Sequence, residues 1–130
     1  MLKRPQIIQL IEPSEQWKTN ATSYVEQSHK ELLLKKDILA SLAARGLSIE
    51  VVQQYRFGWS SKDQFLSRAD WGLEEQFAVG GKPRKLWIPK GLVIPVINST
   101  GQIIRLKVRR PEWKNGDELP KYVAISGSMN

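Results

Sequence analysis

The chain has 130 residues, of which 41% are hydrophobic and 25% charged, with five Trp, one His and no Cys, and its net charge is +7. This composition fits a folded domain and excludes a disordered tail, disulfides and thiolate zinc sites. The single histidine, His29, leaves no imidazole cluster for a metal, and we expect it on a helix surface. No apolar run approaches the ~20 residues of a membrane span, so we expect a cytoplasmic protein without a membrane partner.

Residues 1–45 are predicted to form an N-terminal arm followed by helices. The apolar run at residues 7–11 fits either a strand or a packed extended arm. From Ser14 onward apolar residues recur three or four apart, which is the helical period, and the pattern continues to Arg45 with a candidate break near residue 28.

Residues 46–130 are predicted to form a second unit with a different period. Gly46 ends the helical pattern, since glycine adopts the left-handed conformation, and Ser48 is the predicted N-cap of a short helix. Residues 56–81 are aromatic and irregular, with a short amphipathic piece at residues 63–71. Four strands are then expected at residues 86–88, 92–97, 103–108 and 122–125. The predicted fold class is α+β, with N-terminal helices followed by a small, mostly antiparallel sheet.

The third predicted strand carries a cation at every second position. Successive strand residues point to opposite faces, so Arg105, Lys107 and Arg109 share one face while Ile104, Leu106 and Val108 share the other. Alternate strand residues lie ~6–7 Å apart, which is close to the phosphate spacing of an extended single strand. This pattern indicates nucleic-acid binding.

The basic residues are concentrated in one part of the chain. Residues 82–121 contain ten Lys or Arg against three acidic residues, which accounts for the whole net charge of +7. A basic region that is concentrated in one part of the chain is typical of a surface that binds nucleic acid. The alternative is a solvated lysine-rich surface. The predicted nucleic-acid-binding residues are Arg105, Lys107, Arg109, Lys121, Lys90 and Lys85.

Separate predictions concern Arg110, Trp87 and Trp113, which lie near these cations in the sequence. Arg110 should point away from Arg109 and cap the turn into Pro111. Trp87 is expected in the core because it sits in an apolar strand, with base stacking as the alternative, and Trp113 could also stack on bases. Trp17, Trp59 and Trp71 are predicted core residues.

Four motifs in this order resemble the DnaG-type DNA primases of bacteria and phages. They are Arg45-Gly-Leu-Ser48, Tyr55-Arg-Phe-Gly58, the strand-proline-strand run from Gly91 to Gly101, and Pro120-Lys-Tyr122. The resemblance covers roughly residues 40–128 and corresponds to the N-terminal subdomain of the primase catalytic core, with the basic hairpin region at residues 86–128. It implies that Arg109 and Lys121 face the template or the incoming nucleotide.

The departures from that family concern the catalytic machinery. The chain has no cysteine for the family's zinc module and no Asp-x-Asp cluster like that of the Toprim domain, which holds Mg²⁺ for phosphoryl transfer. We therefore expect a fragment without a cofactor of its own that makes no RNA primer from NTPs alone, while the parent protein would be a nucleotidyltransferase of DNA replication. Two alternatives remain open, a stand-alone single-stranded nucleic-acid-binding module and a domain whose residues 14–45 dock a replicative helicase.

Overall fold

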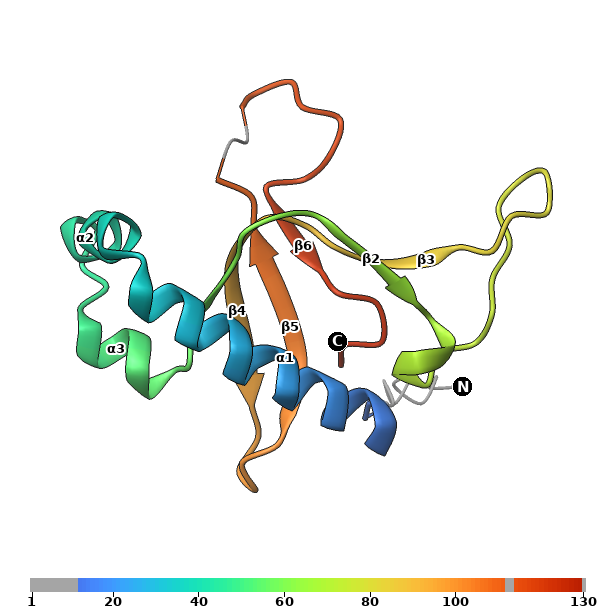
Figure 1. The fold of residues 1–130 in the computed structure, drawn as a ribbon, viewed down its shortest axis with the longest axis horizontal. Coiled ribbons are helices and arrows are strands. Elements are labelled where there is room, and N and C mark those ends of the chain that lie inside the picture. The colour runs from blue at the N-terminus through green and yellow to red at the C-terminus, as the bar shows by residue number, and fades with distance from the viewer. Residues whose placement is uncertain (1–11, 112–113, 130) are drawn as a thin grey trace, which may run out of the picture.

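The computed structural model describes residues 12–111 and 114–129, and it is an α+β fold (Figure 1). Three helices, α1 (Glu15–Leu34), α2 (Lys36–Ala44) and α3 (Ile49–Gln54), come first, and an antiparallel sheet follows. The predicted fold class is thus confirmed. The predicted strand or arm at residues 7–11 lies outside the described residues.

Local sequence signals explain where the helices begin and end. The hydroxyl of Ser14 accepts a hydrogen bond from the Trp17 amide at 3.2 Å, and that of Ser48 accepts one from the Val51 amide at 3.3 Å. These bonds satisfy amide groups that have no partner within the helix. Gly46 has a φ of +88° directly after α2, as its predicted role requires. All three of these predicted helix boundaries are confirmed.

The break between the long helices lies at Lys35, so the predicted break near residue 28 is wrong. Ser28 lies within α1, where its hydroxyl donates to the Val25 carbonyl at 3.2 Å in the preceding turn. Lys35 leaves the helical region with φ −97° and ψ 81°. The resulting turn brings Leu42 of α2 into one apolar cluster with Leu32 of α1.

The main sheet has four antiparallel strands in the order β1-β4-β5-β6. They are β1 (Gly58–Ser60), β4 (Gly91–Ile97), β5 (Ile103–Arg109) and β6 (Tyr122–Ala124). The sheet therefore begins well before residue 86, which corrects the expectation that strands start there. β1 has only three residues and its pairing with β4 is distant in sequence, so it carries little local signal.

A second, two-stranded sheet stands beside the first. It pairs β2 (Gln64–Ser67) with β3 (Lys85–Ile88), and a 3₁₀ turn, η1 (Ala69–Trp71), follows β2. The amphipathic piece predicted at residues 63–71 consists of this strand and turn.

The inner face of the main sheet packs against α1, which crosses it in Figure 1. Trp17 and Val25 of α1 are at most 1% exposed and share a cluster with Val93, Leu106 and Val108 of β4 and β5. The helix comes so close at β1 that a side chain on Gly58 would meet the backbone of Ser28, at 2.8 Å from its carbonyl carbon. Trp17 and Trp71 are both core residues, as predicted.

The outer face of the sheet is covered over only part of its width. Leu32, Leu42, Val52 and Leu92 form a second buried cluster, which joins α1, α2 and α3 to β4. Trp59 packs against this cluster but stays half-buried, so its predicted core position holds only in part. Each of the two clusters contains residues from both sides of position 45, and the division proposed there stays a prediction.

His29 is buried at 8% exposure, so its predicted surface position is wrong. Its Nδ1 lies 2.7 Å from the Phe57 carbonyl oxygen, a partner 28 residues away that local patterns do not reveal.

Across the described residues, no helix combines the length and the apolar character needed to span a membrane.

Pro95, which has no backbone N–H, lies at a position of β4 where the sheet needs no hydrogen-bond donor. It lies opposite Leu106, whose carbonyl accepts from Ile125 on the far side of β5, while β1 ends opposite Val93. Proline is tolerated within a strand at such a position.

Candidate nucleic-acid interface

The alternation predicted for β5 is present in the structure. Leu106 and Val108 are fully buried on the inner face, whereas Arg105, Lys107 and Arg109 are half-buried on the outer face. One detail differs. Ile103 rather than Ile104 joins the buried cluster, next to a register shift between Val96 and Ile97.

The three cations of β5 face apolar neighbours on one side. Antiparallel residues in direct register share a face, and Arg105, Lys107 and Arg109 pair with Val96, Ile94 and Leu92 of β4. The stems of long basic side chains pack well on such surfaces while their charged ends stay in water. The register therefore explains why these side chains are half-buried.

The arginine stems of this face include donors with no partner. The Nε atoms of Arg105 and Arg109 are buried and have no hydrogen-bond partner within the structure described. A buried N–H group without a partner costs free energy, typically ~1–3 kcal/mol. A ligand that accepts hydrogen bonds at this face would recover part of that cost.

Tyr122 of β6 completes the exposed part of the outer face. It lies directly opposite Arg109 and is 46% exposed. The Nζ atoms of Lys107 and Lys121 lie 5.6 Å and 5.9 Å from the centre of its ring, within the range of a cation–π interaction. We name the surface formed by Arg105, Lys107, Arg109, Lys121 and Tyr122 the basic face.

The other two predicted site residues lie elsewhere. Lys90 is in the turn between β3 and β4, where its amide donates to the Asp63 carboxylate at 2.7 Å. It borders a hollow of about 150 Å³ with Trp87 and Arg110. Lys85 is exposed on β3 and borders a separate hollow with Arg68 and Arg84. Four of the six predicted residues thus lie on the basic face, while Lys85 lies on β3 and Lys90 in the turn that follows it.

Arg110 points into the loop that follows β5, and its predicted role as a cap of the turn into Pro111 stays a prediction. Its Nη1 donates to the carbonyl oxygens of Leu119 and Pro120, both at 3.2 Å, and so holds together the two ends of the loop. Trp113, the other predicted stacking residue, lies outside the described residues.

Trp87 of β3 is half-buried and belongs to neither buried cluster, so its predicted core position holds only in part. Leu86 and Ile88 on either side of it are fully buried, and strand alternation turns Trp87 the other way. It pairs in register with Phe65 of β2, which is 61% exposed. The prediction assumed that both faces of the apolar run are buried, whereas the face of Leu86 and Ile88 is fully buried and that of Trp87 only in part.

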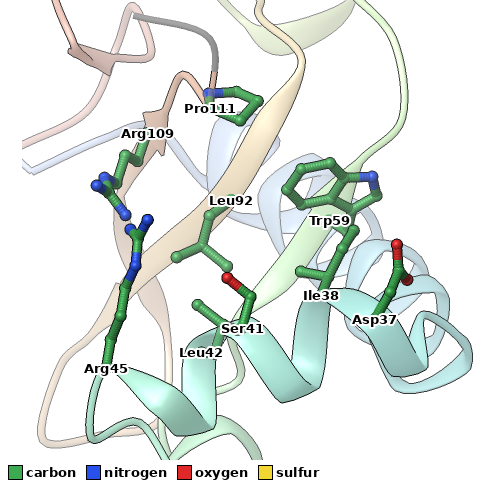
Figure 2. A pocket seen from close by; sticks show the side chains of 9 residues that line it. All are labelled: Asp37, Ile38, Ser41, Leu42, Arg45, Trp59, Leu92, Arg109 and Pro111. Carbon is green, nitrogen blue, oxygen red and sulfur yellow. The ribbon is translucent and has the colours of Figure 1, made fainter.

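A pocket of about 250 Å³ lies between α2 and β4, next to the basic face. In Figure 2 the guanidinium groups of Arg45 and Arg109 point toward one another at one end of this pocket, and Trp59 and Asp37 lie at the other end. Leu92 lies between the two ends. Within the described part of the chain, neither arginine has an acidic partner within ion-pair distance.

Sequence reasoning missed Arg45 and Tyr122 as site residues. Arg45 was part of a motif, but its place in one pocket with Arg109 depends on how α2 packs against the sheet. Tyr122 was part of the Pro120-Lys-Tyr122 motif, and its place beside Lys107 depends on the β5–β6 register. Neither arrangement has a local signal.

Among residues 12–111 and 114–129, no group of three or more His, Cys, Asp or Glu side chains is placed to hold a metal ion.

The chain matches no protein-family model, no curated protein and no solved structure. The resemblance to primases therefore rests on the sequence motifs alone.

Proposed function

We propose that this protein binds single-stranded nucleic acid on its basic face. The observation that carries the proposal is the set of three cations on the outer side of β5, beside an exposed aromatic ring that two lysines approach. Cations supply contacts to phosphates, and an exposed aromatic ring supplies a surface on which any base can stack. This combination is typical of binding with little sequence preference.

The spacing on β5 supports an extended strand as the ligand. Side chains two residues apart on a strand are separated by ~6–7 Å, and so are successive phosphates of an extended single strand. The pairing of Trp87 with Phe65 offers a second aromatic surface, with Lys85 and Lys90 near it. A bound strand would therefore have phosphate contacts and stacking surfaces on both sheets.

We further propose that the chain is the template-binding subdomain of a DnaG-type primase. The four motifs support this role, and the α+β order agrees with it. In this proposal a separate Toprim domain supplies the Mg²⁺ ligands, and template DNA, NTPs and the RNA primer meet between the two parts in the cytoplasm. This chain alone then makes no primer, and a replicative helicase is a candidate partner of the assembled enzyme.

The proposal is tested by measuring binding to a fluorescent single-stranded oligonucleotide at several salt concentrations. Each phosphate contact contributes ~0.7 to the logarithmic salt slope on a single strand. Replacing Arg109 and Lys121 together by Ala should flatten the slope by ~1.4 and weaken binding about tenfold or more at low salt. The loss should be the same for oligonucleotides of different sequence.

The matched control replaces Lys30 and Lys35 by Ala. Both are exposed on the helical side, so the control removes the same charge from outside the basic face. An equal loss of affinity in both double variants would show that general basicity drives binding and would overturn the site. Tight binding of a replicative helicase that requires the exposed side of residues 14–45 would instead favour the helicase-docking alternative. Complete biological activity of this chain without a partner would favour the stand-alone module.

A further inference from the structure

We infer that the pocket between α2 and β4 is a binding site for a single nucleotide with a terminal phosphate. The inference deepens the proposed function, since Arg109 belongs both to the basic face and to this pocket. The ligand would place its phosphate between Arg45 and Arg109 and its nucleoside against the apolar floor of the pocket.

The two arginines make the phosphate end of the site. Both side chains line the pocket, and their guanidinium groups point toward one another in Figure 2, although like charges repel. The C-terminal end of α2 explains why a cation is favourable at Arg45, but it does not explain why this side chain extends toward Arg109. A phosphate dianion between two guanidinium groups would relieve the repulsion and accept paired hydrogen bonds from both.

A buried donor adds an independent observation at the same end. Nε of Arg109 is buried and has no hydrogen-bond partner among the described residues. The arginine fork presents Nε–H and Nη–H in parallel, which matches two oxygens of one phosphate. The site therefore contains an N–H donor, Nε of Arg109, that has no hydrogen-bond partner among the described residues.

The rest of the pocket suits a nucleoside. Ile38, Leu42, Trp59 and Leu92 provide an apolar lining, and Asp37 lies beside Trp59 at the end away from the arginines. A carboxylate only accepts hydrogen bonds when ionised, so Asp37 would suit the amino group of a base or the hydroxyls of a sugar. The volume of about 250 Å³ lies just below the ~300–1,000 Å³ range of sites for drug-sized molecules. It fits one nucleoside, with the phosphate at the rim.

Calorimetric titration with AMP, adenosine and inorganic phosphate tests the site. AMP should bind, and adenosine and phosphate should each bind at least about tenfold more weakly, because each lacks one half of the contacts. Arg45→Ala should weaken AMP binding about tenfold, and Arg45→Lys should fall between, since lysine keeps the charge but loses the paired geometry. Lys36→Ala is the control, because it removes an exposed cation from the same helix outside the pocket.

Two sources of the phosphate are separated by oligonucleotides with and without a 5′-phosphate. A preference for the 5′-phosphorylated strand that Arg45→Ala abolishes would identify a strand end as the ligand. AMP binding without that preference would identify a free nucleotide. AMP affinity that equals that of phosphate, or that does not change in Arg45→Ala, would overturn the inference.

The same variants separate this inference from the proposed function. Lys107→Ala should weaken binding of an internal stretch of single strand and leave AMP binding unchanged, because Lys107 is on the basic face and outside the pocket. Arg45→Ala should do the reverse. Circular dichroism melting confirms that each variant is folded, as expected for positions outside the buried clusters.

Discussion

The two faces of the four-stranded sheet differ in what covers them. The inner face lies under α1 and contributes fully buried side chains such as Val93, Leu106 and Val108. The outer face lies under helices only over β1 and β4, where Leu92 belongs to the second cluster. The part that remains over β5 and β6 carries cations and an exposed tyrosine. Incomplete coverage by helices thus creates a surface whose side chains are not needed for the core.

Neighbouring residues of β5 should separate stability from binding most strongly. Leu106 is fully buried, and Leu106→Ala should lower the free energy of unfolding by about 2–5 kcal/mol through lost contacts and the cavity left behind. Lys107→Ala, one residue away, should change it by no more than ~0.5 kcal/mol. Urea denaturation measures both values. Equal losses in the two variants would contradict the division of the strand into two faces.

The close approach of α1 to β1 should be the next most sensitive point. Gly58→Ala should lower the free energy of unfolding by about 1–3 kcal/mol, because the added carbon has no room against Ser28. Removing the Ser28 hydroxyl as well should not restore stability, since the backbone carbon of Ser28 still lies 2.8 Å from the added atom. If the double variant Gly58→Ala/Ser28→Ala fully recovered the free energy of unfolding, the steric clash would involve the Ser28 hydroxyl alone. The measurement is again denaturation by urea.

A smaller effect of opposite sign is expected at Arg56. This residue follows α3 with a φ of +59°, a conformation that costs a non-glycine residue ~1–2 kcal/mol. The amide of Phe57 bonds back to the Val52 carbonyl at 3.1 Å, which closes the helix end at this position. Arg56→Gly should raise the free energy of unfolding by about 1 kcal/mol and leave binding to the basic face intact. A destabilised variant would show that the arginine side chain makes a larger contribution than its backbone strain costs.

The smallest expected effect depends on pH and concerns Tyr24 of α1. Burial raises the pKa of the Tyr24 phenol above its usual value of 10.0. Because the folded state favours the neutral phenol, its contribution to stability is fully present below pH ~10 and is lost as pH rises further. Tyr24→Phe should therefore lose less stability than the natural protein between pH 9 and 11. Thermal melting across this range measures the difference, and parallel curves would contradict it.

The parts of the fold that follow local rules could be predicted from the sequence. The caps at Ser14 and Ser48 and the stop at Gly46 depend on neighbouring residues, and so does the alternation along β5. β1 and the buried position of His29 could not be predicted, because each depends on a partner far along the chain.

The candidate site follows the same division. Which cations of β5 share a face could be predicted, since it depends only on the strand period. That Lys107 and Lys121 meet at Tyr122 could not, because it depends on the register of β6. Whether the basic face and the adjoining pocket bind nucleic acid stays a prediction.

The contact between Trp17 and the last described residues has a consequence for the order of folding. The indole of Trp17 donates to the Ser126 carbonyl at 2.8 Å, across 109 positions of sequence, and a side chain on Gly127 would collide with the same ring. Ile125 beside them is 1% exposed. On the ribosome, α1 emerges before residues 125–127, and the contacts that cover its tryptophan cannot form until this segment has been synthesised. Such distant closure is slow, and a nascent chain that stops short of Ile125 would expose Trp17 to chaperones and proteases.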